Sequence, residues 1–178
     1  ILTLSGSTTS AWTGGNNVNG GTLRLSASNV LSTTGTMNIG LAAGPAALEL
    51  SSGVSQTLAA LTFYGSGTTT ASQANLILGT GAALALGGNL TVNSSGGGQG
   101  AIVYGPGSLA LGAARTFAIN DSATVPASSF ELTVNAPVTG SFVLTKTGVG
   151  NLLLAGNNTY GGLAVGSTAA HTAWPASW

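Results

Sequence analysis

Short runs in which leucine alternates with a small or polar residue recur along the whole chain, and Gly, Asn or Ser separates them. Alternation with period two places the leucines on one face of a β-strand and the other residues on the opposite face. No segment carries a convincing apolar stripe at helical spacing. The clearest runs are residues 22–25, 47–50, 74–78, 83–86, 108–111, 130–134 and 151–154. This repetition predicts an all-β repeat protein.

The spacing of the runs indicates which all-β architecture the chain adopts. The first leucines of the principal runs stand at positions 23, 48, 76, 109, 132 and 152. A second set of runs follows several of them, at residues 36–39, 61–63, 90–92, 116–119 and 142–144. Two or three short strands in every ~20–30 residues are typical of one turn of a solenoid. We therefore predict a parallel β-helix (β-solenoid) of about seven coils over residues 1–166, followed by an atypical C-terminal tail at 167–178.

Two segments carry the repeat most clearly. Residues 144–162 read LTKTGVGNLLLAGNNTYGG, and LTLSG at 2–6 leads through WTGGNN at 12–17 to GGTLRL at 20–25. Both place an L-x-L triplet before Ala/Ser-Gly, then a polar turn, then Gly-Gly before another β-run. They resemble the autotransporter-associated β-strand repeat of bacterial autotransporter passengers. The resemblance implies a parallel β-helix displayed outside the cell or on the bacterial surface, and it implies no activity.

Charge is nearly absent from this chain. Ordinary soluble domains have roughly 25% charged residues, whereas only six of these 178 carry a full charge: Arg24, Glu49, Arg115, Asp121, Glu131 and Lys146. Disordered chains combine low hydrophobicity with high charge, so the 43% apolar content predicts a folded chain. A surface without charge repulsion favours association. Self-assembly is the expected consequence.

The composition also argues against several partners and cofactors. Three basic residues are too few for a nucleic-acid surface. The lack of cysteine excludes a thiolate metal site, and a single Asp does not supply repeated calcium-binding loops. No run approaches the ~18 apolar residues of a membrane-spanning helix. We expect no cofactor, no metal and no membrane insertion. A start at Ile1, with no leader pattern, suggests a processed product or part of a longer protein.

Catalytic groups are scarce. A nucleophilic triad would have to join His171, in the tail, to Asp121, without a nucleophile elbow. Glu49 and Glu131 could be imagined as a glycosidase pair, but each occupies the middle of an L-E-L or F-E-L triplet, where the alternation predicts an outward, solvated side chain. We therefore expect no catalytic residues and no enzyme.

Asparagine, threonine and aromatic residues are the other side chains that could form a contact surface. Paired asparagines at 16–17 and 157–158 are expected at turns, with a glycan-contact surface as the alternative. Ice-binding solenoids display ranks of T-x-T, but here the triplets begin at positions 34, 68 and 145, at intervals that match no coil length. The phenylalanines at 63, 117, 130 and 142 lie in β-runs and are expected in the core.

The ends of the solenoid are the candidate site. A first strand at residues 1–4 would expose a strand edge, and the sequence provides neither a charged residue nor a capping helix there to prevent pairing with another chain. The candidate assembly contacts are Ile1, Leu2, Leu4, Trp12, Trp174 and Trp178. The hypothesis is a structural unit of a bacterial surface fibre or stalk, self-assembling head to tail. The alternatives are an autotransporter-like adhesin that binds cell surfaces or glycans, and a carbohydrate-active β-helix enzyme.

Overall fold

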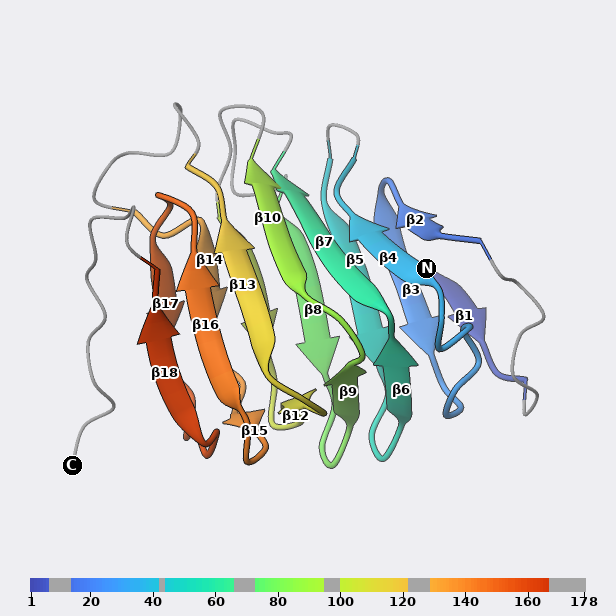
Figure 1. Cartoon of the computed structure of the whole chain (residues 1–178). Helices are drawn as coiled ribbons and strands as arrows, with labels where there is room; N and C mark the ends of the chain where they lie inside the picture. Colours follow the sequence, from blue (N-terminus) through green and yellow to red (C-terminus); the bar gives the residue numbers. More distant parts are fainter. Residues whose placement is uncertain (7–13, 42–43, 66–72, 95–99, 122–128, 167–178) are drawn as a thin grey trace.

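The computed structural model describes residues 1–6, 14–41, 44–65, 73–94, 100–121 and 129–166. These residues contain strands and no helix, and every strand pairing is parallel. The strands stack as a β-solenoid, as predicted (Figure 1). The tail at 167–178 lies outside the described residues.

Three parallel sheets form the solenoid. Sheet A contains, in spatial order, β1 (Leu2–Leu4), β3 (Gly21–Leu25), β5 (Ala46–Leu50), β8 (Ala74–Leu78), β11 (Ala101–Tyr104), β14 (Leu132–Val134) and β17 (Leu152–Leu154). Sheet B contains β2 (Asn16–Val18), β4 (Thr36–Ile39), β7 (Ala60–Gly65), β10 (Leu90–Ser94), β13 (Arg115–Ile119), β16 (Val143–Thr147) and β18 (Gly162–Val165). Sheet C contains β6 (Ser55–Leu58), β9 (Ala83–Leu86), β12 (Ser108–Leu111) and β15 (Val138–Thr139).

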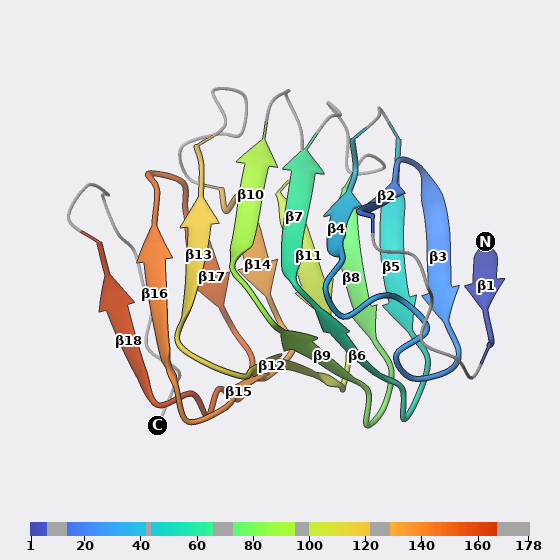
Figure 2. The same cartoon turned by 45° about the vertical axis from the view of Figure 1, so that its right-hand side comes forward.

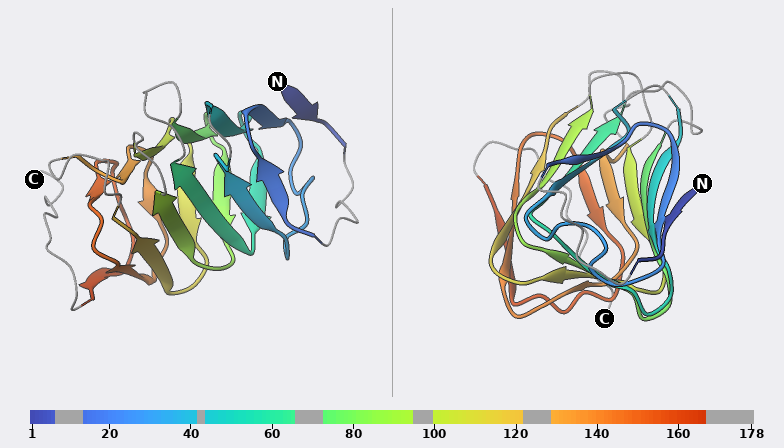
Figure 3. Two further views of the ribbon diagram at one scale, coloured as in Figure 1. Left: turned by 90° about the horizontal axis from the view of Figure 1, so that it is seen from above. Right: turned by 90° about the vertical axis from the view of Figure 1, so that its right-hand side faces the viewer.

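The chain visits sheets A and B alternately, so the two seven-stranded sheets correspond to seven coils. Only the third to sixth coils add a strand of sheet C between the other two. Sheet C runs along the lower edge of the molecule in Figure 2, and the end-on view in Figure 3 shows the sheets surrounding a common interior. A continuous apolar column fills that interior.

The L-x-L leucines form this column. Of the eight that the alternation marks most clearly, six are buried: Leu25, Leu48, Leu50, Leu109, Leu111 and Leu152. Leu23 and Leu154, in coils nearer the ends, are half-buried and pack against the core. Phe63 and Phe117 are fully buried, as expected. Phe130 is half-buried, whereas Phe142 is exposed, so the core prediction is wrong for Phe142.

The register along sheet A corrects the spacing inferred from leucines. The ladder aligns Leu2, Leu23, Leu48, Leu76, Val103, Val134 and Leu154. Successive coils therefore contain 21, 25, 28, 27, 31 and 20 residues. Leu109 does not belong to this ladder, because β12 pairs with β9 and β15 in sheet C. The fifth strand of sheet A is β11, which ends in Val-Tyr and has no L-x-L triplet.

The corner between β16 and β17 explains the K-T-G-x-G segment. Gly148 has φ +77°, and a Cβ there would lie 2.2 Å from the carbonyl oxygen of Ile119 in the coil below. Only glycine combines this conformation with so close an approach. The Gly150 amide then donates to the same oxygen at 2.9 Å. The glycines thus let the last coil turn tightly while it stays bonded to its neighbour.

Candidate functional site

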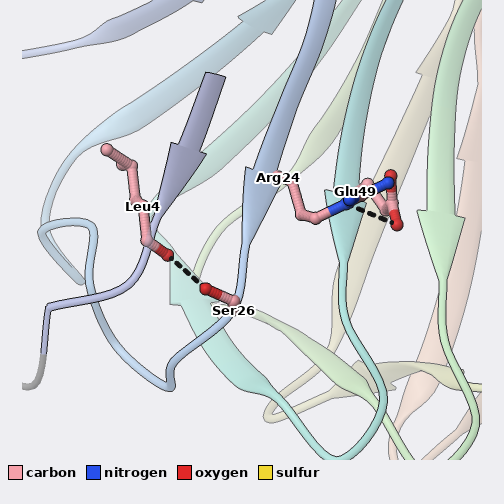
Figure 4. A network of polar contacts seen from close by, with 4 residues as sticks. All are labelled: Leu4, Arg24, Ser26 and Glu49. Carbon is pink, nitrogen blue, oxygen red and sulfur yellow. Dashed lines mark hydrogen bonds and ion pairs between the residues drawn. The ribbon is translucent and has the colours of Figure 1, made fainter. Parts of the chain in front are cut away.

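The N-terminal end of the described solenoid presents an open strand edge. β1 pairs with β3 on one side, and no other strand of the described ranges pairs with its second side. Leu2 and Leu4 align with Leu23 and Leu25, whose column they extend, yet Leu2 is 63% exposed. Ser26 holds the strand in place, because its hydroxyl donates to the Leu4 carbonyl oxygen at 3.1 Å and its amide to the same oxygen at 2.9 Å (Figure 4). Within the described part of the chain, this end therefore offers unpaired backbone beside an exposed end of the apolar column.

The opposite end is open in the same way. Among the described strands, β18 pairs only with β16, and β17 only with β14. Leu163 and Val165 align with the inward-facing Leu144 and Lys146, so they stand at the top of the interior column. They are nevertheless 45% and 41% exposed, because no further described strand covers them. The two ends thus present backbone edges and apolar side chains of the same kind.

Half of the predicted assembly residues can be placed. Ile1, Leu2 and Leu4 lie at the N-terminal edge, as expected, and Ile1 is 81% exposed. Trp12, Trp174 and Trp178 lie outside the described residues. The sequence prediction missed Leu163 and Val165. The run L-A-V after two glycines is the signal that could have identified them as part of a final strand.

One ion pair lies on the outer face of sheet A, near the N-terminal end. Arg24 and Glu49 are partners in the ladder between β3 and β5, and Arg24 Nε lies 2.9 Å from Glu49 Oε1. The N–H bond is not aligned for a hydrogen bond, so the contact is a Coulombic one (Figure 4). Both side chains are partly solvated, and such pairs contribute about 0–1 kcal/mol. Glu49 is therefore a surface strand residue, as predicted.

Glu131 corrects the prediction from alternation. It directly precedes β14 and is 1% exposed rather than outward and solvated. Its carboxylate accepts a hydrogen bond from the Asn151 amide in the next coil. The F-E-L pattern misleads here because Glu131 lies at the corner before the strand, where strand alternation does not apply. Among the residues described, Glu131 and Lys146 are the only charged side chains classed as buried.

Lys146 occupies an interior position of β16, level with the buried Phe117 in the coil below. Its ammonium group donates to the Gly148 carbonyl oxygen at 2.9 Å. Burial lowers the pKa of Lys146 because desolvation disfavours the charged form, and the negative charge of Glu131 opposes this shift. Burial also raises the pKa of Tyr160, which packs against the core.

The carboxylates considered as a glycosidase pair are far apart. Two strands, β8 and β11, lie between β5 with Glu49 and β14 with Glu131. Three strand spacings amount to about 14 Å, beyond the ~5–9.5 Å between paired glycosidase carboxylates. Glu49 is also on the outer face, whereas Glu131 is buried. Asp121 is exposed after β13, and His171 lies outside the described residues.

No group of three His, Cys, Asp or Glu side chains that could hold a metal occurs within the described parts of the chain. A helix long and apolar enough to cross a membrane is likewise missing from those parts.

The asparagines serve mainly to link coils. Asn16 and Asn17 lie in β2 rather than in a turn, which corrects the sequence prediction. The Asn38 amide donates to Asn17 Oδ1 at 2.8 Å, between adjacent strands of sheet B. In the loop after β17, Asn158 Oδ1 accepts from the Val138 amide at 2.9 Å. These side chains therefore hold successive coils together.

Comparison with known proteins adds no functional information. No protein-family model, curated protein or solved structure matches this chain.

Proposed function

We propose that this protein is a structural unit of a bacterial surface fibre, in which copies of the solenoid join head to tail. The observation that carries the proposal is the pair of open ends of the described solenoid, where no other described strand pairs with the terminal strand edges and apolar residues are exposed. Exposed parallel strand edges template the addition of further strands. The resemblance to autotransporter repeats supports an extracellular or cell-surface location.

The register of sheet A supports a continuous stack. Leu2 and Leu154 stand in the same column of the ladder. A second copy placed on β17 could therefore set its Leu2 on Leu154 and extend the apolar column without a change of pattern. A head-to-tail contact of this kind does not close on itself, so it propagates as a filament.

The scarcity of charge supports the same proposal. Neither β1, β17 nor β18 contains a charged residue, whereas soluble proteins commonly place charges on exposed sheet edges to prevent such pairing. Net charge is zero at pH 7, so little long-range repulsion opposes the approach of two copies.

Light scattering and electron microscopy of the purified chain test the proposal. We expect particles that grow with protein concentration and appear as unbranched filaments. Leu163→Lys should block growth, because it places a charge at the end of the interior column. Ala110→Lys, on the outer face of sheet C, is the matched control and should assemble normally. Strictly monomeric wild-type particles at all concentrations would overturn the proposal.

Adhesion is the second candidate function, and one observation favours it. Ile77 and Tyr104 are ladder partners on the outer face of sheet A, and Ile102 lies on the same face of β11. Apolar side chains gathered on a face can mark a contact surface. Retention of the chain on cultured cells or glycan arrays, lost in Tyr104→Ser and kept in Thr57→Ser, would support adhesion.

A further inference from the structure

The outer face of sheet B carries two regular ranks of small uncharged side chains. The first rank contains Thr36, Ala60, Thr116, Thr145 and Ala164, together with Asn89, which directly precedes β10. The second rank contains Asn17, Asn38, Thr62, Thr91, Ala118 and Thr147, each the ladder partner of the next. Half of these twelve residues are threonine. In Figure 1 the strands that bear them lie side by side across the front of the molecule.

Neither rank contains a charged residue. The two charged residues in the strands of sheet B are Arg115 and Lys146, at alternate positions to the outward ranks. Lys146 is buried, and Arg115 Nε donates to the Leu86 carbonyl oxygen at 2.8 Å. The two ranks therefore present only hydroxyl, amide and methyl groups, and the exposed Asp121 follows Asn120 beyond them. Charge complementarity thus selects an uncharged, hydrogen-bonding partner.

The groups on this face are held in fixed positions. Threonine is branched at Cβ and has few χ1 rotamers. The Asn38 amide donates to Asn17, and at the other edge of the face the Asn120 amide donates to Asn93 Oδ1 at 2.7 Å. Within sheet B, the strands β4, β7, β10, β13 and β16 are each paired with a strand on both sides. A preorganised surface loses little conformational entropy when it binds.

The ranks form a two-dimensional lattice. Neighbouring strands are ~4.8 Å apart, and outward residues repeat every ~6.7 Å along a strand. Both repeats are close to those of the oxygen positions on the prism faces of ice. The irregular intervals between T-x-T triplets in the sequence do not matter, because coils of 20 to 31 residues still bring Thr62 beside Thr91 and Thr116 beside Thr145.

We propose that the outer face of sheet B binds ice. The hydroxyl and amide groups hydrogen-bond to the first layer of water, and the threonine and alanine methyl groups occupy the spaces between those water molecules. Binding requires no ion, cofactor or covalent step. It uses the side of the solenoid rather than its ends, so it is independent of head-to-tail assembly.

Ice-crystal growth in a solution of the full chain tests this proposal. We expect the wild-type protein to shape single ice crystals and to produce a measurable gap between melting and growth temperatures. Thr91→Tyr, in the centre of the face, should abolish most of that gap because the larger side chain prevents close contact with the lattice. Thr57→Tyr, on the outer face of sheet C, is the matched control and should retain it. Circular dichroism melting curves report whether each variant is folded.

A conservative variant and a second ligand complete the test. Thr91→Ser removes a single methyl group, so it should remain folded and reduce the gap in part even if the tyrosine variant does not fold. Co-sedimentation with microcrystalline cellulose identifies the other neutral, hydroxyl-rich partner that such a face could fit. A wild-type chain without effect on ice, equal loss in the Thr57→Tyr control, or binding to cellulose but not to ice would each overturn the proposal. Light scattering of the same samples reports assembly separately.

Discussion

Lys146 shows how a charged side chain can occupy the interior column at an energetic cost. Its aliphatic stem replaces the aromatic ring that occupies the same column in the coil below, at Phe117. Lys146 is 7% exposed, and its ammonium group depends on the Gly148 carbonyl oxygen and the nearby charge of Glu131. Burial of a charge is costly unless it is paired and hydrogen-bonded. This cluster should therefore respond to pH.

We predict that Lys146→Met changes how stability depends on pH. Burial lowers the pKa of Lys146 from 10.5, so the folded chain holds this proton less tightly than the unfolded chain. The contribution of Lys146 to stability therefore rises as pH increases from the lowered folded value towards 10.5. Denaturant unfolding of both proteins between pH 7 and 10.5 should show that the free energy of unfolding of the wild type increases relative to that of the variant.

Tyr160 affects the pH dependence of stability in the opposite direction. Burial raises its pKa above 10.0, so its contribution to the free energy of unfolding falls as pH rises past that value. Tyr160 is present in both proteins, so its effect cancels in the difference. The control Arg24→Met removes a partly solvated cation from the surface. A constant difference between wild type and Lys146→Met across the range would contradict the prediction.

We also predict that Gly148→Ala is strongly destabilising. The left-handed backbone conformation costs roughly 1–3 kcal/mol for a residue with a side chain, and the added Cβ would meet the Ile119 carbonyl oxygen. Gly20→Ala is the matched control, because nothing lies within 4 Å of a Cβ at that position. Thermal melting should separate the two variants clearly. Equal melting temperatures would mean that the corner does not need glycine.

At the scale of strands, the alternation in the sequence was enough to predict which face of most strands is buried. Residues 22–25, 47–50 and 83–86 all match described strands with inward leucines or alanines. What the sequence could not supply was the sheet to which each run belongs. An L-x-L run has the same pattern in sheet A and in sheet C, so the spacing of leucines wrongly predicts that Ser108–Leu111 belongs to the principal ladder.

The errors at Glu131 and Phe142 have a common physical origin in the corners. Alternation holds only within a strand, and Glu131 and Phe142 each stand directly before one. The open ends were predictable at β1 because the run begins at Leu2, but β18 has no L-x-L pattern. The ranks on sheet B depend on register between coils of different length, and that register is visible only in three dimensions.

We predict that Leu109→Asp unfolds the chain or destabilises it by more than ~4 kcal/mol, because a charge would enter the apolar column. Leu109 is fully buried in β12. Ala110→Asp is the matched control, since the next residue of the same strand faces outward and is half-exposed. Equilibrium unfolding in urea measures both. Similar stabilities for the two variants would contradict the inward assignment of Leu109.

The whole molecule should be least stable at its ends. Each coil contacts mainly its neighbours, so stability is a sum of coil and interface terms, and a terminal coil has one interface fewer. We predict that amide hydrogen exchange is slowest in β8 and β10 and fastest in β1 and β18 for the unassembled chain. Uniform protection along the ladder would contradict this gradient. In filaments, the amides of β1 and β18 should become protected as well.

The parallel ladder also has a mechanical consequence. Its hydrogen bonds connect one coil to the next and therefore point along the axis of the solenoid, so tension applied along that axis pulls on few bonds at a time. The chain should lengthen in separate steps, each releasing one coil of 20 to 31 residues, or about 70–110 Å of extended polypeptide. Under a sudden pull, such a protein would extend coil by coil, and this extension would limit the force on whatever the fibre is attached to.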